Sequence, residues 1–122
     1  MFVDTTLNIR VPLVNAGTAK YAQMPYRGRV INVIGIVHGT TSDTSVNVTL
    51  TAPSQSSGVT LGVLNFNNAS GVGAGEAGTY TANASTGNTV LSADTPLLFT
   101  VLSTSIGAVS TACQLQVELS PY

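Results

Sequence analysis

Few residues of this chain are able to do chemistry, and they are scattered. His38 is the only histidine and Cys113 the only cysteine among 122 residues. A catalytic triad needs an oriented histidine beside its nucleophile, and a histidine-based metal site needs several ligands in one place. Asp43 lies near His38 in the sequence, but no serine stands in a nucleophile-elbow motif. We therefore interpret His38 as a strand-end histidine and Cys113 as a small buried hydrophobic residue.

The carboxylates are also isolated from one another. They number five, which are Asp4, Asp43, Glu76, Asp94 and Glu118. A glycosidase needs two carboxyl groups facing one sugar ring, and calcium needs several oxygen ligands in one loop. No Asp-rich loop supplies them. The sequence predicts no catalysis, no bound metal and no cofactor, so that the chain is not an enzyme.

Residues 73–78, GAGEAG, match the glycine pattern of dinucleotide-binding loops. That pattern binds a cofactor only when a strand precedes it and a helix follows it. Here Thr79, Tyr80 and Thr81 follow, which is a strand sequence. We interpret residues 67–78 as a glycine-rich loop that is either mobile or held by a partner.

The densest cationic spot is the segment Tyr26-Arg27-Gly28-Arg29. One interpretation is a solvated start of a strand; the other is a pair of arginines that meet carboxylates on a partner. A nucleic-acid-binding protein needs a basic stripe that neutralises phosphates. Four scattered cations and a net charge of −1 do not form one, so we expect no nucleic-acid partner.

Residues 29–37, RVINVIGIV, are the segment around which the other elements are expected to be arranged. Six of them are β-branched, and turn residues bound the run on both sides, which favours a strand over a helix. Apolar residues occupy both alternating positions, with Val30, Ile34 and Ile36 on one face and Ile31, Val33 and Val37 on the other. We predict a central strand whose second face is covered by a neighbouring chain or segment.

The rest of the chain predicts further strands. Residues 7–13, 45–51 and 109–119 alternate between apolar and polar, and shorter runs occur at 20–24, 59–66, 79–82, 89–91 and 97–103. Pro12 places the first run at an edge, and Gly62 is expected to break the run 59–66. About eight short strands with turns between them predict an all-β, antiparallel, jelly-roll-like β-sandwich.

Residues 1–6 are expected to form an N-terminal arm and residues 7–122 a single domain. Phe2 and Val3 make the arm apolar enough to dock on a partner, although a frayed terminus is the simpler interpretation. No apolar run is long enough for a membrane helix, and no basic segment precedes an apolar one, so we expect no membrane partner and folding in the cytosol.

Charged residues make up only 7% of the chain. Sheet edges are usually protected by lysine, proline or bulges, and Lys20 is the only lysine, placed outside the main predicted strands. We expect the edges to be covered instead by a homo-oligomer or by a host surface.

Several of these segments resemble the small decoration (cement) proteins of tailed-bacteriophage heads. The resemblance is carried by residues 10–13, 24–30, 33–39 and 88–97, which are RVPL, MPYRGRV, VIGIVHG and NTVLSADTPL. It implies a jelly-roll-like sandwich that trimerises and binds the major capsid protein on the outside of an assembled capsid. The expected location is the outer capsid surface of a virion assembled in the host cytoplasm.

Two other functions remain open from the sequence. One is a carbohydrate-binding β-sandwich module, although tryptophan is absent and aromatic residues are few. The other is a head-fibre or tail-associated β-domain, which shares the same strand pattern. The residues expected to contact a partner are Phe2, Val3, Arg10, Tyr26, Arg27, Arg29 and Tyr122.

Overall fold

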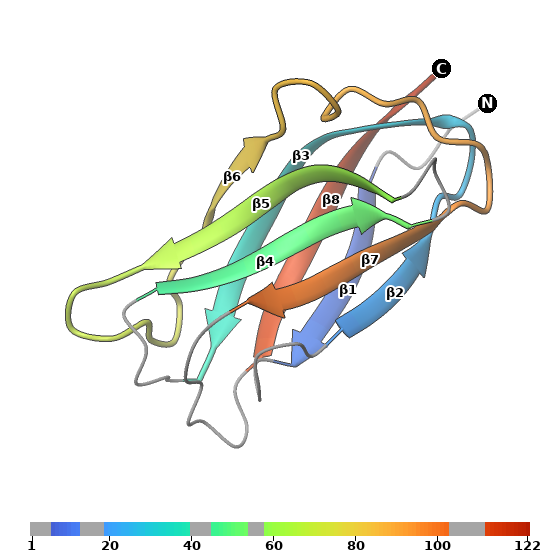
Figure 1. Ribbon diagram of the computed structural model, residues 1–122. Helices are drawn as coiled ribbons and strands as arrows, with labels where there is room; N and C mark the ends of the chain where they lie inside the picture. Colours follow the sequence, from blue (N-terminus) through green and yellow to red (C-terminus); the bar gives the residue numbers. More distant parts are fainter. Residues whose placement is uncertain (1–5, 13–18, 40–44, 54–57, 103–111) are drawn as a thin grey trace.

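The computed structural model describes residues 6–12, 19–39, 45–53, 58–102 and 112–122, and there the chain forms strands and no helix (Figure 1). The strands are β1 (Thr6–Pro12), β2 (Ala19–Gln23), β3 (Gly28–His38), β4 (Ser45–Ala52), β5 (Val59–Asn67), β6 (Thr79–Ala82), β7 (Pro96–Leu102) and β8 (Ala112–Pro121). These described residues include no helix able to span a membrane. Phe2 and Val3 lie outside the described residues.

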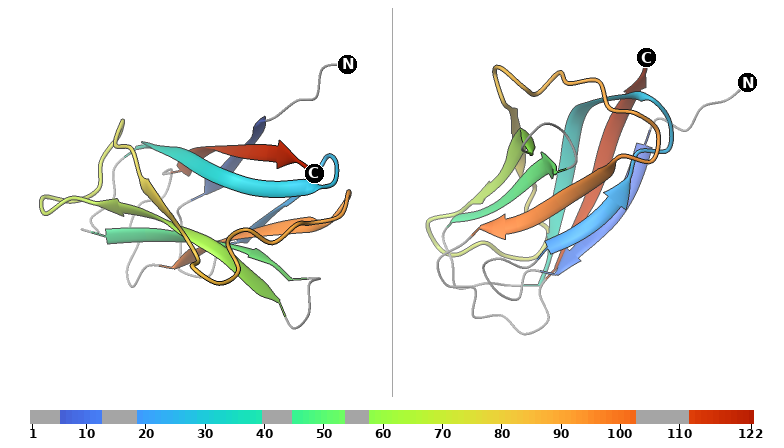
Figure 2. Two further views of the ribbon diagram at one scale, coloured as in Figure 1. Left: turned by 90° about the horizontal axis from the view of Figure 1, so that it is seen from above. Right: turned by 45° about the vertical axis from the view of Figure 1, so that its right-hand side comes forward.

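The strands form two antiparallel sheets, one of three strands in the order β1-β8-β3 and one of five in the order β2-β7-β4-β5-β6. Figure 2 shows them as two layers facing each other. A jelly roll places its first, eighth and third strands side by side and its second, seventh, fourth and fifth in the opposite sheet. The chain follows that order, which confirms the predicted jelly-roll-like sandwich. β6 departs from it by pairing with β5.

Alternation along each strand builds the core between the sheets. In β4, Val46, Val48 and Leu50 are at most 2% exposed, while the residues between them face outward. The same alternation buries Cys113, Leu115, Val117 and Leu119 of β8. The inward and outward faces predicted for residues 45–51 are confirmed, as are those of 7–13 and 109–119 wherever these are described.

β3 differs from the predicted central strand in two ways. It is the last strand of its sheet, bonded to β8 on one side only. A bulge between Val30 and Asn32 shifts its register against β8. As a result, Val30 shares the buried face with Val33 and Val37, and not with Ile34 as its sequence position suggested. The predicted division of faces was therefore wrong for Val30 and Ile31, but it is confirmed after the bulge, where Val33 and Val37 share one face and Ile34 and Ile36 the other.

The glycine-rich loop lies along the free edge of β3. The Val37 amide donates to the Glu76 carbonyl at 2.9 Å, the Gly75 amide to the Val37 carbonyl at 2.7 Å, and the Gly78 amide to the Gly35 carbonyl at 3.0 Å. Val72 anchors the loop with a fully buried side chain. The loop is held by its own chain, so neither predicted alternative, mobility or a partner, is needed.

The sheet edges carry some protection within the chain itself, and their cover by a homo-oligomer or a host surface stays a prediction. The loop covers part of the edge of β3. β1 ends in Pro12, which has no amide hydrogen to offer an added strand. β2 carries an exposed Lys20, which lies within this strand, and β6 has only four residues. Short edge strands and lysine discourage edge-to-edge pairing.

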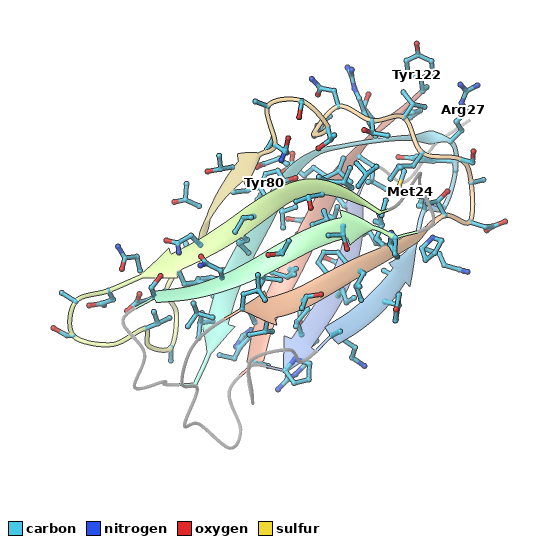
Figure 3. The ribbon with its side chains drawn as sticks, in the orientation of Figure 1. Met24, Arg27, Tyr80 and Tyr122 are labelled. Atoms are coloured by element: carbon cyan, nitrogen blue, oxygen red, sulfur yellow. The ribbon has the colours of Figure 1, made fainter. Side chains whose placement is uncertain are left out.

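Two smaller predictions about strands also need correction. β5 is continuous through Gly62, where the missing side chain leaves room for the phenol ring of Tyr80 in β6 (Figure 3). Residues 89–91 do not form a strand. Leu91 makes a single bridge to Gly28, with its amide donating to the Gly28 carbonyl at 2.7 Å.

Candidate binding surfaces

His38 and Cys113 do not form a catalytic pair. Val37 lies opposite Cys113 in the register of β3 and β8, so that His38 belongs to the outward face of the sheet and Cys113 to the inward face. His38 is exposed at the end of β3, and Cys113 is fully buried. Both positions agree with the structural roles predicted for them.

Burial raises the pKa of the Cys113 thiol to about 12, against 9.0 for an exposed thiol. The folded chain therefore keeps the thiol proton at pH values where the unfolded chain loses it. Above the unfolded pKa, each pH unit removes about 1.4 kcal/mol from the free energy of unfolding. This penalty grows until the pH reaches the folded pKa.

We expect wild-type protein to lose about 1.4 kcal/mol more stability than Cys113→Ala between about pH 8 and about pH 10. Urea denaturation of both proteins under reducing conditions measures the difference, and the variant corrects for every other titrating group. Parallel stability curves would show that the thiol is as accessible to ionisation in the folded chain as in the unfolded one.

The described carboxylates lie apart. Glu76 sits in the loop beside β3, Asp94 is exposed in the turn before β7, and Glu118 is half-buried on β8. Within the described ranges, no three His, Cys, Asp or Glu side chains come together in a group suited to a metal ion.

Glu76 has a structural role that explains the dinucleotide-like glycine pattern. Its Oε1 accepts hydrogen bonds from the Gly73 amide at 3.1 Å and from the Asn68 side-chain amide. Gly75 has a φ of 85°, which favours glycine, and β6 follows where a cofactor site would require a helix. Residues 73–78 therefore form a turn whose backbone is hydrogen-bonded to β3.

One end of the sandwich brings two of the predicted contact residues together. The Arg27 guanidinium lies 5.3 Å from the centre of the Tyr122 ring, and the Tyr122 amide donates to the Arg27 carbonyl at 3.0 Å. Figure 3 shows both side chains at this tip, where the described chain ends. Tyr122 is 73% exposed. We call Arg27 and Tyr122 the cationic tip, since an exposed cation–π pair keeps its charge available to a partner.

The remaining predicted contact residues are placed differently. Tyr26 is half-buried and packs against the core, so most of its ring serves the fold. Arg29 is half-buried on β3, opposite Ser120 of β8. Arg10 is exposed on β1, opposite Gln114. The structure thus brings Arg27 and Tyr122 together but leaves Arg10 on a different part of the surface.

A second surface was missed as a binding candidate. Three isoleucines of β3 are exposed although they lie in the most apolar run of the chain, with fractions of 51% for Ile31, 41% for Ile34 and 43% for Ile36. They share the outer side of the three-stranded sheet with Asn8, Gln114 and Gln116. We call these six residues the isoleucine face.

A groove of about 270 Å³ crosses the isoleucine face. Its walls are the side chains of Asn8, Ile34, Ile36, His38, Gln114 and Gln116. The register explains this composition, because Asn8 lies opposite Gln116, and Gln116 lies opposite Ile34. The sequence signal was the apolar character of both faces of residues 29–37, which indicated that β3 has an outer apolar side.

The opposite outer face, that of the five-stranded sheet, is polar and nearly uncharged. Thr49 lies opposite Thr100 of β7, and Asn47 accepts a hydrogen bond from the Asn65 side-chain amide across β4 and β5. The sandwich therefore has one outer face rich in threonine and asparagine and one that exposes isoleucine.

Comparison with known protein families finds no match, and comparison with characterised proteins finds no relative.

Proposed function

We propose that the chain is a structural subunit that binds the outside of an assembled phage capsid as a homotrimer and cements the shell. The observation that carries the proposal is the isoleucine face, where three exposed isoleucines lie beside three amide side chains. Apolar side chains at this level of exposure gain free energy when a protein surface covers them. The resemblance of residues 24–30 and 33–39 to capsid decoration proteins supports the same class of partner.

A trimer makes weak contacts with a shell effective. Once one subunit is bound, attachment of the second and third becomes intramolecular, which raises the overall affinity by about 10²–10⁴ when the geometry matches. A capsid repeats its surface, so it provides the matching set of sites. In this proposal the isoleucine face and the arm carrying Phe2 and Val3 supply the main, neutral contacts to the major capsid protein. The cationic tip, Arg10 and Arg29 add a few charged contacts.

A carbohydrate-binding module is the alternative from a different class. Sugar sites stack rings against the sugar face. Two tyrosines are strongly exposed among the described residues, Tyr21 at 64% and Tyr122 at 73%. They belong to different sheets, with Tyr21 in the edge strand β2 and Tyr122 directly after β8, and this arrangement does not favour a shared stacking platform.

The test is co-sedimentation with shells assembled from the major capsid protein encoded in the same genome. We expect saturable binding that changes little with salt, because few charges take part. Deletion of Met1–Asp4 or substitution of Arg27→Ala should weaken binding, and Gln23→Ala on the exposed edge of β2 is the matched control. Absence of binding to these shells, or binding only to glycans on an array, would contradict the proposal.

A further inference from the structure

We propose that the cationic tip binds a carboxylate side chain of the shell protein, with Arg27 as the contact residue and Tyr122 as the residue that positions its guanidinium. The inference rests on the proposed function, which supplies the partner. It goes further by naming the chemical group that this end of the sandwich recognises and by giving the two residues separate roles.

Hydrogen bonds to distant segments fix the backbone around Arg27. The Arg27 carbonyl accepts a hydrogen bond from the Tyr122 amide at 3.0 Å. The following residue, Gly28, exchanges two backbone hydrogen bonds with Leu91, at 3.0 Å and 2.7 Å. The Arg27 side chain therefore starts from a rigid base, and a group held in this way loses less conformational entropy when it binds.

The Tyr122 ring holds the guanidinium without neutralising it. The guanidinium carbon lies 5.3 Å from the ring centre, within the reach of about 6 Å for a cation–π contact (Figure 3). Among the described residues, no carboxylate forms a salt bridge with Arg27. Both side chains are exposed, so the N–H groups of the guanidinium remain open to an oxygen of a partner.

The charges at this end of the sandwich favour an acidic partner. Arg29 follows two residues after Arg27, and these are two of the four cations of a chain whose net charge is −1. Asp94 belongs to the same end, because its amide donates to the Met24 carbonyl at 2.8 Å. It forms no salt bridge with either arginine, and within the described residues both arginines are without a counter-ion. A carboxylate on a partner supplies one.

The geometry of a single arginine selects a carboxylate over a nucleic acid. The planar guanidinium donates two parallel hydrogen bonds to the two oxygens of a carboxylate. A nucleic acid requires a row of cations along its phosphates, whereas this end offers the exposed guanidinium of Arg27 and the half-buried one of Arg29. The occupant is therefore an Asp or Glu side chain on the surface of the shell protein.

The first test compares variants of the two residues in co-sedimentation with the assembled shells. Arg27→Gln should weaken binding about tenfold, the size expected for the loss of a hydrogen bond between charged groups. Arg27→Lys keeps the charge but loses the planar fork, and it should weaken binding nearly as much. Lys20→Gln, which removes an exposed cation from β2, is the matched control and should bind like wild type. Unchanged binding of Arg27→Gln would overturn the proposal.

The role of Tyr122 is tested by keeping or removing its ring. Tyr122→Phe should bind like wild type, whereas Tyr122→Leu should bind about as weakly as Arg27→Lys. Because Tyr122 is 73% exposed, neither variant should move the midpoint of urea unfolding. Binding of Tyr122→Leu at the wild-type level would overturn the positioning role.

The second test identifies the partner group itself. A carbodiimide joins an amine to a carboxylate that it contacts directly. With Arg27→Lys bound to shells at saturation, the reagent should crosslink position 27 to an Asp or Glu of the shell protein, which mass spectrometry of the peptides locates. Wild-type protein, whose only lysine is Lys20, is the control and should lack this crosslink. Absence of the crosslink at full occupancy would contradict a carboxylate at this position.

The two proposals fail in different ways. If wild-type protein does not bind the shells, the proposed function fails, and the partner assigned here fails with it. If wild-type protein binds and Arg27→Gln binds equally well, the proposed function stands and the role of the cationic tip is wrong.

Discussion

Replacing Phe66 by alanine should lower the free energy of unfolding by about 3–5 kcal/mol, the range for removing a large side chain from a packed core. Phe66 is fully buried in β5. Together with the Leu64 side chain, its ring fills the space left by Gly35 of β3 and Gly78 of the loop. The variant therefore leaves a cavity at the point where the loop, the three-stranded sheet and the five-stranded sheet meet.

Urea denaturation of the Phe66→Ala variant measures this loss. Leu102→Ala is the control, because Leu102 is 51% exposed at the end of β7 and its truncation should change stability by no more than about 0.5 kcal/mol. A loss near that of the control would mean that Phe66 does not connect the two sheets. The free energy of unfolding of a domain of this size is typically roughly 6–18 kcal/mol. The expected loss is therefore a large fraction of the total stability of the fold.

Gly35→Val should destabilise the fold by about 3 kcal/mol, because it overfills a packed core. A Cβ at this position would lie 2.5 Å from Leu64 Cδ2 and 2.9 Å from Leu115 Cδ2. Valine also favours a strand more than glycine does, by up to about 1 kcal/mol, but the steric cost exceeds that gain. Ile36→Val, one residue along and exposed, is the matched control.

A double-mutant cycle identifies the cause of the Gly35 effect. Leu64→Val removes the methyl group that a Cβ at position 35 would meet first. We expect Gly35→Ala to cost about 1 kcal/mol less in the Leu64→Val protein than in the wild type, a coupling typical of residues in contact. Additive effects would mean that Gly35 is required for a reason other than the space occupied by Leu64.

Alternation of apolar and polar residues was sufficient to predict most of the fold. The strands β1, β4 and β8 are single runs of alternating type, so their faces follow directly from residue position. Pro12 indicated an edge because it lacks an amide hydrogen, and β1 is an edge strand. These features depend only on local sequence.

The errors concern positions that tertiary contacts decide. The bulge at Ile31 adds one unpaired residue to β3, so the residues after it lie on the opposite face from the one that alternation counted from Val30 predicts. Apart from the polar Asn32 within an apolar run, the local sequence contains no sign of this bulge. The loop is ordered by backbone hydrogen bonds to β3 and by the Glu76 carboxylate, which composition does not reveal. Gly62 leaves space for Tyr80, a residue 18 positions away that reaches it only in the folded chain.

The candidate surfaces were predicted in part. Arg27 and Tyr122 were both expected to contact a partner, and the structure places them together although they lie 95 positions apart in the sequence. The sequence predicted that a neighbouring chain or segment covers one of the two apolar faces of residues 29–37. It did not identify Ile34 and Ile36 as the outer face, because that assignment requires the register of β3 against β8.

Shell stability tests the central claim most directly. The heat-induced opening of assembled shells is measured by calorimetry with and without a saturating amount of the protein. If the chain cements the capsid, the opening temperature rises with occupancy and stops rising at saturation, because binding to the closed shell alone stabilises it. An opening temperature that does not change at full occupancy would contradict a cementing role.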